Sequence, residues 1–477
     1  MATVRPARGV EAGTRRSVAK RPGRAYPGSD RSEVPLAGAS RGGERPANSQ
    51  ILRIAAVSPG WDSDRAPRPP ETRMSSLNST TAGQAAALTA DIGQGPTTAG
   101  QAAALATGVG PGVGLPRIAG AAHAVPGAIP QRELWSSFGD AHYKGNRVAQ
   151  RIWEASGIET RHFAIDPRVE DTLDWSTEQR MQRYLPEAMP LGREAVAGAL
   201  ERSGLAASDV GLFAVASCTG YVTPGLDILL ASELGMAPDV ARLLIGHMGC
   251  YAAMPGLAAV ADYVTARGRP AVLLCLELTS LHGQPPSPTV TETEQTYDDL
   301  MQIVAHSLFA DAASAVALVP GTSRGPDVSV PGFEVLDFVV RTDGGSPEHM
   351  AWEITDLGFK MVLSPQVPDV LAAHVSDVVG ELLGRNGLRA EEIAGWAVHP
   401  GGRRILEVVE EKLELPEEAM AASYGVLRDF GNCSSATVLL VLERLLGDPT
   451  ITDDAPLVAM AFGPGLTLYA ALLRRRA

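Results

Sequence analysis

The sequence predicts an α/β fold, because buried strands alternate with helical patterns along most of the chain. Short apolar runs at 210–217 and 270–278 have the length and composition of strands that are covered on both faces. Helical patterns at 191–203 and 226–234 stand before and between these runs. Alternation of this kind is typical of a sheet with helices packed on its faces.

The expected elements repeat in the two halves of the chain. In the first half we expect strands at 116–120, 210–217, 243–245 and 270–278, helices at 143–157, 191–203, 226–234 and 251–265, and regular structure again at 303–319. The second half has a shorter set, with strands at 333–340, 393–398, 457–462 and 466–473 and helices at 366–387, 401–413 and 434–446. Two halves of similar size, 115–325 and 326–477, predict a pseudo-duplicated fold. A polar, acidic stretch at 282–300 interrupts the first half and is expected to form a surface loop or lid.

Residues 1–114 form an N-terminal extension that we expect to be disordered and of low complexity. The first 73 residues carry 14 Lys+Arg against 7 Asp+Glu, a net charge of +7, without sustained apolar periodicity. A short unit at 80–88 recurs at 97–105, but two copies are too few to stack into a solenoid. The extension is interpreted either as a basic interaction tail or as a linker behind an over-called start codon, in which case Met74 is the true start.

Composition and charge exclude several classes of function. The net charge is −13, so the chain after residue 73 carries −13 − 7 = −20, which disfavours non-specific nucleic-acid binding. Four widely spaced cysteines without a CxxC pair predict neither a zinc site nor a disulfide framework, and they favour a reducing compartment. No apolar run approaches the ~20 residues of a membrane helix, and the N-terminus lacks a secretory signal. We therefore expect a cytoplasmic protein without metal, membrane or nucleic-acid partners.

Three short segments are expected to form a reactive site. Cys250 follows the apolar residues 243–245 and precedes an Ala-rich helical stretch, so it is predicted to lie at a strand-to-helix turn. The helix dipole would lower the pKa of its thiol there. His399 and Asn432 lie far along the chain, in His-Pro-Gly-Gly and Gly-Asn-Cys-Ser-Ser. Such a set is a candidate for nucleophilic catalysis, although each residue taken alone could be a buried thiol, a structural histidine or a turn residue.

These segments resemble the type III polyketide synthases, the chalcone synthase-like branch of the thiolase superfamily. Two further pieces carry the resemblance, the Leu-Phe-Ala-Asp segment 308–311 and the Gly-Pro-Gly-Leu-Thr segment 463–467. The similarity runs from about residue 116 to the C-terminus, and the 33 residues from His399 to Asn432 are a spacing typical of the family. The resemblance implies a thiolase-like fold with two αβαβα halves and a homodimer. It also implies an acyltransferase similar to bacterial alkylpyrone synthases, which needs no cofactor and uses acyl-CoA and malonyl-CoA as substrates.

The chemistry of the three residues suits this activity. A Claisen condensation needs an acyl group held as a thioester, which a cysteine thiolate can form. His399 is expected to stabilise the thiolate as an imidazolium. With Asn432 it is also expected to donate hydrogen bonds to the thioester oxygen of malonyl-CoA. Such donors stabilise the enolate that forms on loss of CO2, an effect worth ~3–4 kcal/mol per donor.

The resemblance also implies roles for a set of pocket residues. Phe309 and Phe359 are expected to stand between the CoA tunnel and the reaction cavity. The residues expected to line that cavity are Cys218, Thr219, Thr223, Thr279, His282, Met350 and Ser434. Arg151, Arg161 and Arg404 are candidates for the CoA phosphates, with a solvated surface arginine as the alternative for each.

Small residues in the loop 217–225 favour one outcome for the product. Cys218, Thr219 and Thr223 leave a tunnel away from Cys250 unblocked, so we expect medium or long acyl-CoA starters and alkylpyrone products. The rival outcome is a malonyl-primed tetrahydroxynaphthalene synthase, for which a cavity cysteine such as Cys218 is apt. The further alternatives are a ketoacyl-acyl-carrier-protein synthase III-like enzyme, which makes one condensation, and a non-catalytic binding partner of the same fold.

Overall fold

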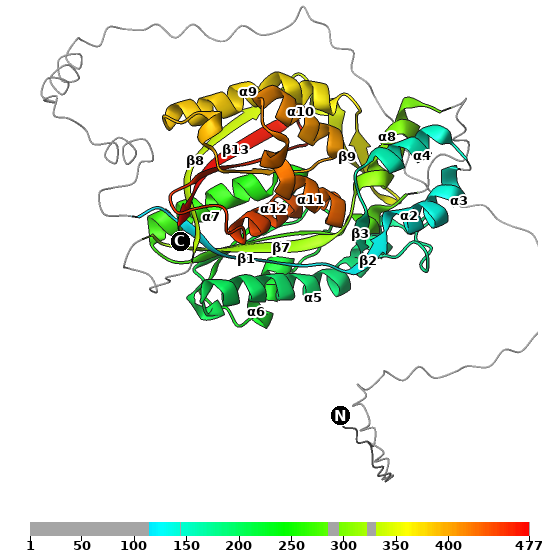
Figure 1. The fold of residues 1–477 in the computed structure, drawn as a ribbon. Helices are drawn as coiled ribbons and strands as arrows, with labels where there is room; N and C mark the ends of the chain where they lie inside the picture. The colour runs from blue at the N-terminus through cyan, green and yellow to red at the C-terminus, as the bar shows by residue number, and fades with distance from the viewer. Residues whose placement is uncertain (1–113, 144, 285–294, 322–330, 477) are drawn as a thin grey trace, which may run out of the picture. The chain divides into compact units, whose positions relative to one another are not determined.

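A computed structural model describes residues 114–143, 145–284, 295–321 and 331–476 (Figure 1). The expected disordered extension therefore lies outside the described residues, apart from Gly114. So do residues 285–294 of the predicted lid and residues 322–330 of the link between the halves, which contains the predicted boundary at 325.

The described chain contains strands and helices in an order close to the expected one. The strands are β1 (Arg117–Ala124), β2 (Gly127–Pro130), β3 (Thr160–Phe163), β4 (Leu212–Ala216), β5 (Ala241–Ile245), β6 (Ala271–Glu277), β7 (Ala312–Val319), β8 (Gly332–Thr342), β9 (Met350–Thr355), β10 (Gly358–Leu363), β11 (Gly395–Val398), β12 (Pro456–Gly463) and β13 (Thr467–Arg476). The α-helices are α2 (Gln131–Leu134), α3 (Asp140–Tyr143), α4 (Arg147–Ala155), α5 (Thr177–Ser203), α6 (Leu226–Glu233), α7 (Ala253–Arg267), α8 (Tyr297–Leu308), α9 (Val367–Arg385), α10 (Arg403–Leu413), α11 (Ala421–Phe430) and α12 (Ala436–Leu446). A π-helical turn, Trp135–Gly139, joins α2 to α3.

The sheet topology confirms the predicted pseudo-duplication. The main sheet of the described residues has the strand order β11-β12-β13-β8-β1-β7-β6-β4-β5. In the first half, β1 pairs antiparallel with β7, β7 antiparallel with β6, and β6 parallel with β4. In the second half, β8, β13, β12 and β11 repeat these three pairings in the same order. The same topology is therefore built twice, and the two copies meet where β1 pairs with β8.

Figure 1 shows the helices and strands in five layers. Helices α5 and α6 cover one side of the first half, α9 and α10 cover the opposite side of the second half, and α7 and α12 lie between the two. Buried apolar side chains of α7 and α12 form one core cluster with residues of β6 and β12. The central helices are therefore apolar on most of their surface, which explains the Ala-rich sequence after Cys250.

The structure corrects two sequence-based expectations about the elements. Helix α5 begins at Thr177 rather than near residue 191, and it contains Pro186 and Pro190. Both prolines are on the exposed face of the helix, while Tyr184 and Ala188 on the other face are buried, so tertiary packing outweighs the cost of proline. The hairpin of β9 and β10 was not predicted, because its partly exposed strands lack a continuous apolar run.

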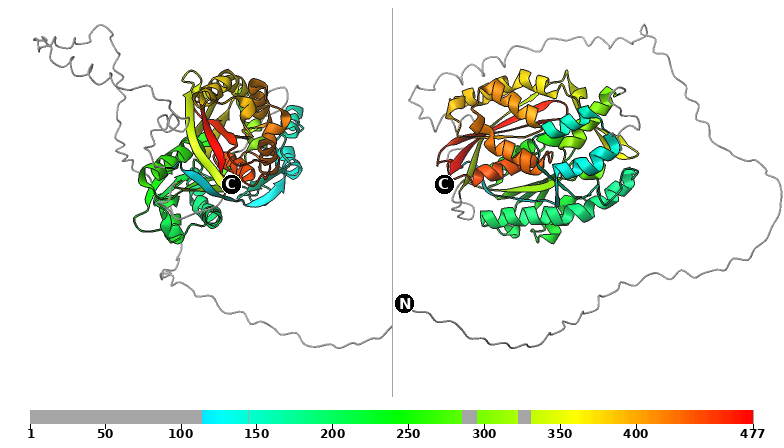
Figure 2. Two further views of the ribbon diagram at one scale, coloured as in Figure 1. Left: turned by 60° about the vertical axis from the view of Figure 1, so that its left-hand side comes forward. Right: turned by 45° about the vertical axis from the view of Figure 1, so that its right-hand side comes forward.

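Helices α2 to α4 lie together with α8 at one end of the described fold (Figure 2). Helix α4 packs directly on α8, and α8 leads into the Leu-Phe-Ala-Asp segment. Within the described residues, no helix has the length and apolar character needed to cross a membrane.

Candidate active site

Cys250 lies on the 3₁₀ turn Gly249–Tyr251, which joins β5 to α7. Gly249 has φ +65°, a left-handed conformation that favours glycine, and a Cβ there would lie 2.7 Å from Cδ of Pro464. Gly463 is confined by contact alone, since a Cβ there would lie 2.7 Å from Cδ1 of Tyr251 and 3.3 Å from N of Cys250. The terminal Gly-Pro-Gly segment therefore packs on the turn that carries the thiol.

One pocket brings the three predicted catalytic residues together. It has a volume of about 260 Å³ and is lined by Cys250, His399 and Asn432, with Phe309 and Met350 beside them. Most of its other walls are apolar side chains from α4, α8, β10 and the start of α9, and two arginines lie at the start of α10. We call it the active-site pocket. An apolar cavity with a few convergent polar groups is the usual form of a small-molecule site.

His399 follows β11 directly and is fully buried. Its backbone N–H donates to O of Met460 (2.8 Å), and its ring packs edge-on against Phe462, with 5.5 Å between centroids. Neither Nδ1 nor Nε2 has a hydrogen-bond partner among the described residues. Burial lowers the pKa of His399 to about 3, so the ring is neutral at pH 7. Both ring nitrogens are therefore available to a ligand in the pocket.

The Asn432 side chain makes two hydrogen bonds to the backbone and one to the Cys250 sulfur. Its Oδ1 accepts from the N–H of Ser434 (2.9 Å), and its Nδ2 donates to O of Gly401 (3.1 Å). The backbone is fixed as well, since its N–H donates to O of Leu308 and its O accepts from the N–H of Ala310, both at 2.9 Å. Because an amide nitrogen carries two N–H groups, the second is the one that reaches the Cys250 sulfur, and a ligand bound beside that sulfur can share it.

Burial raises the pKa of the Cys250 thiol to about 12. A hydrogen bond with Ser434 opposes the rise, the charge of Glu277 adds to it, and a hydrogen bond with Asn432 opposes it again. The predicted lowering by the helix dipole is therefore outweighed by burial, since Cys250 is 4% exposed. To attack as a thiolate the sulfur must pass its proton to a base, and His399 lines the same pocket. Once the proton has moved, the negative sulfur and the positive imidazolium attract each other. This attraction lowers the pKa of the thiol and raises the pKa of the imidazole.

Phe309 stands where the active-site pocket adjoins two smaller cavities, because it lines all three. One of them, of about 50 Å³, is also lined by Phe359 and His282. These two rings stack at 4.3 Å between centroids, and the N–H of Phe359 donates to Nδ1 of His282 (3.1 Å). The other ring nitrogen of His282, Nε2, donates to O of Thr219 (2.7 Å). The two phenylalanines thus share a cavity, but Phe359 does not line the active-site pocket.

The acid of the Leu-Phe-Ala-Asp segment has a structural role. Asp311 is fully buried, and its carboxylate accepts hydrogen bonds from the N–H of Ala164 (2.8 Å), from the N–H (2.8 Å) and hydroxyl of Ser280, and from the hydroxyl of Thr279 (3.1 Å). The Thr279 hydroxyl also lies 2.9 Å from O of Ala310. Asp311 therefore ties the loop after α8 to the turn after β6, and Thr279 lies in that junction.

A buried carboxyl group that the sequence analysis missed lies close to the nucleophile turn. Glu277, at the end of β6, is fully buried. Its Oε2 accepts from the N–H of Cys218 (3.0 Å) and the hydroxyl of Thr219 (2.9 Å), and its Oε1 accepts from the hydroxyl of Ser435 (2.6 Å). Burial raises the pKa of Glu277 to about 7, although these hydrogen bonds lower it. The sequence offers one signal for this buried carboxyl group, a single acidic residue at the end of an otherwise apolar run.

We expect the Glu277 carboxyl to make folding stability fall as the pH rises. Its folded-state pKa of about 7 lies above the ordinary value of 4.5, so the folded state binds this proton more tightly. That stabilisation is complete below pH 4.5 and is lost as the pH approaches 7, with an upper bound of about 3 kcal/mol. Glu277→Gln should flatten the dependence of the unfolding free energy on pH in that range, as measured by urea denaturation. Equal slopes for wild type and variant would contradict the assignment.

The loop of small residues after β4 does not form the floor of the active-site pocket. The Thr219 side chain is fully buried, and its hydroxyl points to Glu277. Thr223 is exposed, and Sγ of Cys218 accepts from the N–H of Gly249 (3.1 Å). None of these three side chains lines the pocket, and for Thr219 the reason is the buried carboxyl group, which accepts from its hydroxyl.

The arginines predicted to contact CoA phosphates differ in their surroundings. Arg404 lines the active-site pocket, is 56% exposed and is paired with Glu411 (2.8 Å). Arg403, which the sequence analysis missed, lines the same pocket. Arg151 is exposed on α4. Arg161 is 1% exposed, so its predicted contact with a phosphate is corrected to a role inside the fold.

The chain matches the N-terminal domain of the chalcone and stilbene synthases over residues 147–322 and their C-terminal domain over residues 337–476. It is 34% identical to the 3,5-dihydroxyphenylacetyl-CoA synthase of Streptomyces toyocaensis over 366 residues, which are 75% of this chain and 90% of that protein. It is 35% identical to the 1,3,6,8-tetrahydroxynaphthalene synthase of Streptomyces peucetius subsp. caesius over 338 residues, 69% of this chain and 83% of that protein. It is 32% identical to the alpha-pyrone synthesis polyketide synthase-like Pks18 of Mycobacterium tuberculosis over 328 residues, 67% of this chain and 80% of that protein.

Solved structures show the same fold. The 1,3,6,8-tetrahydroxynaphthalene synthase of Streptomyces coelicolor A3(2) superposes with a TM-score of 0.68 at 25% identity, covering 76% of this chain and 99% of that one. PKS-I from the brown alga Ectocarpus siliculosus gives a TM-score of 0.68 at 28% identity with the same coverage. The predicted thiolase-like α/β fold is confirmed.

Proposed function

We propose a reaction for this chain, which belongs to the chalcone and stilbene synthase family and is a type III polyketide synthase. The enzyme loads an acyl-CoA starter on Cys250 and extends it with malonyl-CoA. It then cyclises the chain to an alkylpyrone or a related phenolic product. The observation that carries this proposal is the active-site pocket. A buried thiol meets there an imidazole whose two nitrogens have no partner in the described chain and an amide whose second N–H reaches the thiol.

In the loading step, the sulfur of Cys250 attacks the carbonyl carbon of the acyl-CoA thioester. His399 takes the thiol proton and returns it to the departing CoA sulfur, so a new thioester replaces the old one. A neutral imidazole is required to accept that proton, and burial keeps His399 neutral. The buried pocket also excludes water from the acyl-enzyme.

In the extension step, malonyl-CoA loses CO2 and leaves an enolate at the thioester. The negative oxygen needs donors, and the second N–H of Asn432 and the N–H of His399 are proposed to bind it. The enolate carbon then attacks the acyl carbon on Cys250, and the cysteine sulfur leaves as a thiolate. The product is a β-ketoacyl-CoA two carbons longer, which can be loaded again.

The apolar walls of the active-site pocket support acceptance of acyl chains, but the small-residue loop no longer supports the tunnel predicted from it. The test is mass spectrometry of products from malonyl-CoA with short, long and aromatic acyl-CoAs. The proposal predicts alkylpyrones from medium or long starters. A single condensation that requires malonyl carrier protein would instead favour the synthase III-like alternative.

A malonyl-primed tetrahydroxynaphthalene synthase is the second candidate. The observation that favours it is the position of Cys218, whose Sγ accepts from the N–H of Gly249 directly before the nucleophile. Identity of 35% to a tetrahydroxynaphthalene synthase supports it as well. A pentaketide product from malonyl-CoA alone, unaffected by added acyl-CoA, would select this candidate.

We propose that two copies of the chain associate through the edge strand β5. This strand ends the main sheet, and it exposes Leu243 (37%) and Leu244 (55%). Ile228 and Tyr221, in and before the neighbouring helix α6, are 41% and 72% exposed. An unpaired edge with adjacent apolar side chains is a suitable surface for a second copy.

Leu244→Glu should therefore convert the protein from dimer to monomer, because it places a charge in the apolar patch. Light scattering coupled to size-exclusion chromatography measures the mass directly. Ile354→Glu is the matched control, since Ile354 is 76% exposed on the β9–β10 hairpin, which is separate from the main sheet, and should leave the mass unchanged. A Leu244→Glu protein that stays dimeric would rule out β5 as the interface.

A further inference from the structure

Phe309 also lines a second cavity, of about 100 Å³, which we call the aromatic side pocket. Its defining residues are Phe138, Trp153, Arg161, Phe163, Thr279 and Phe309. It shares Phe309 with the active-site pocket, and otherwise the two have no lining residue in common. The side chain of Phe309 is thus the partition between the pocket that holds the thiol and the aromatic side pocket.

The backbone that carries this partition is fixed. The N–H of Phe309 donates to O of Ala305 (3.2 Å), and its O accepts from Nη1 of Arg161 (2.9 Å). Residues on both sides of it bond to the backbone of Asn432. Rotation of the Phe309 side chain can therefore join the two pockets without movement of the main chain.

The aromatic side pocket contains a buried cation with an unused donor. Arg161 donates from Nε to Oε1 of Gln131 (2.7 Å), and from Nη1 to O of His306 (2.8 Å) as well as to Phe309. Its Nη2 is buried and has no hydrogen-bond partner among the described residues. The guanidinium carbon lies 4.9 Å from the ring centre of Trp153 and 5.0 Å from that of Phe163. Aromatic rings cover the cation but offer no oxygen to its free N–H groups.

A second unpaired donor is on Trp153, a residue that lines the aromatic side pocket and also a cavity beside Gln131 and Ile158. Nε1 of Trp153 is buried and has no hydrogen-bond partner in the described part of the chain, and Trp153 is 3% exposed. Buried donors are nearly always paired in folded proteins, so two in one cavity need an explanation. In the described residues, the comparable pair of unpaired atoms is on His399, at the centre of the active-site pocket.

The charges around Arg161 do not supply the missing acceptor. Asp311 interacts with it through charge, but the hydrogen bonds of that carboxylate go to the backbone at 164 and to residues 279 and 280. His306 is neutral, because burial lowers its pKa to about 3, and its Nδ1 lies 2.6 Å from the hydroxyl of Tyr143. The described residues therefore leave the cavity without an oxygen acceptor for this donor.

We propose that the aromatic side pocket binds an oxygen-bearing segment of the acyl chain, a ketone or carboxylate oxygen, through Nη2 of Arg161 and Nε1 of Trp153. The inference rests on the proposed malonyl-CoA extension and adds a specificity determinant to it. The apolar rings accept the carbon chain, while the two donors select chains with an acceptor over plain alkyl chains. Polar sites discriminate strongly in this way, because an analogue without the oxygen leaves buried donors unpaired.

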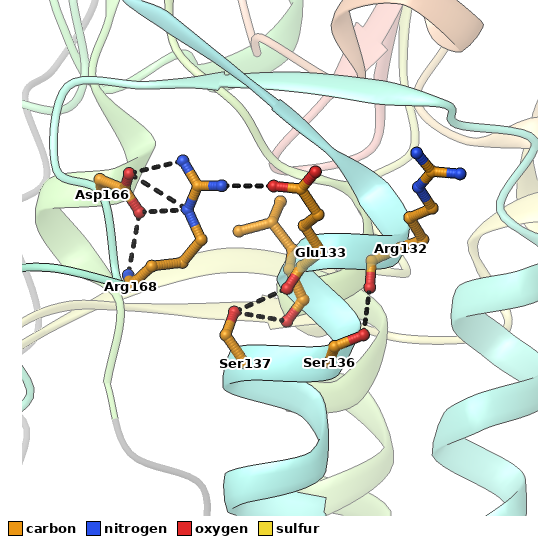
Figure 3. Close-up of polar contacts among 7 residues, drawn as sticks. Arg132, Glu133, Ser136, Ser137, Asp166 and Arg168 are labelled. Carbon is orange, nitrogen blue, oxygen red and sulfur yellow. Dashed lines mark hydrogen bonds and ion pairs between the residues drawn. The ribbon is translucent and has the colours of Figure 1, made fainter.

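A charged cluster fixes one wall of the aromatic side pocket. Arg168 bonds Asp166 with two nitrogens (2.9 and 2.8 Å) and Glu133 with a third (2.5 Å), as Figure 3 shows. These bonds tie the loop that carries Pro167 to α2, and Pro167 and Leu134 both line the pocket.

Two starters of the same shape test the inference. Glutaryl-CoA ends in a carboxylate, and 5-methylhexanoyl-CoA carries an isopropyl group of equal size in its place. Loading of Cys250 is followed as kcat/KM for CoA release, and the number of extensions from malonyl-CoA alone is read by mass spectrometry. Wild type should prefer glutaryl-CoA or should extend malonyl-derived chains through several rounds. The first outcome means that the oxygen bound in the aromatic side pocket belongs to the starter. The second means that it belongs to the growing chain.

Trp153→Phe keeps an aromatic ring and removes the donor, and it should reduce the glutaryl preference or the yield of the longest chains by roughly 3- to 10-fold. Arg161→Lys should reduce the same quantity by roughly 10- to 100-fold, since a charged donor is lost. Trp135→Phe is the matched control, because Trp135 packs on Trp153 at 5.5 Å but does not line the pocket, and it should change neither readout.

If Trp153→Phe and a folded Arg161→Lys protein keep the wild-type starter preference and the wild-type chain lengths, the inference is wrong. This failure can be separated from a failure of the proposed function. In the first case wild type still condenses malonyl-CoA, and in the second it does not.

Discussion

Cys250→Ala is expected to abolish starter loading and every polyketide product. The sulfur is the atom proposed to carry the acyl chain, and no other thiol lines the active-site pocket. A methyl group cannot form a thioester, so residual activity should be below detection. Mass spectrometry of the intact protein after incubation with acyl-CoA would show the added acyl mass for wild type and not for the variant.

Cys275→Ala is the matched control for this substitution. Cys275 is a fully buried free cysteine within β6 and does not line the pocket, so the variant should load normally. Its stability should fall by ~1 kcal/mol, because a buried sulfur leaves a small cavity. Full polyketide formation by Cys250→Ala would overturn the assignment of the nucleophile. Absence of thioester formation in wild type would instead favour a non-catalytic protein of this fold.

The elements of the sheet could be predicted because their signals are local. The apolar runs of β4 and β6 and the helical pattern of α6 lie close to their predicted positions. The start of α5 could not be predicted, because burial of Tyr184 and Ala188 against distant strands outweighs two prolines. Burial of this kind depends on contacts between residues far apart in the chain, which a window of sequence does not contain.

Some residues of the candidate site could be predicted from local motifs, and others could not. Cys250, His399 and Asn432 stand in short motifs, and the structure places them in one pocket. The position of Arg161 depends on carbonyl groups 145 and 148 residues away, so the sequence could not distinguish a surface arginine from a buried one. The burial of Glu277 could not be predicted for the same reason, since its hydrogen-bond partner Ser435 lies 158 residues away in the chain.

Asn432→Ala is expected to lower decarboxylation and condensation of malonyl-CoA by roughly 10²- to 10³-fold, the usual effect of removing one oxyanion donor. Starter loading should change by less than about tenfold, because Asn432 has no titratable group and can act only as a donor. Release of CO2 from malonyl-CoA and acylation of Cys250 are measured separately, so the two steps can be compared in one preparation.

Asn432→Asp separates the proposed role from a structural one. Aspartate keeps an oxygen that can accept from the N–H of Ser434, but it lacks the N–H groups of Nδ2. If the donor to the enolate matters, the aspartate variant should be as inactive in extension as the alanine variant. If the bond to Ser434 matters, aspartate should restore extension. Acylation of Cys250 that falls as far as extension in both variants would mean that Asn432 positions the thiol, since its side chain also hydrogen-bonds that sulfur.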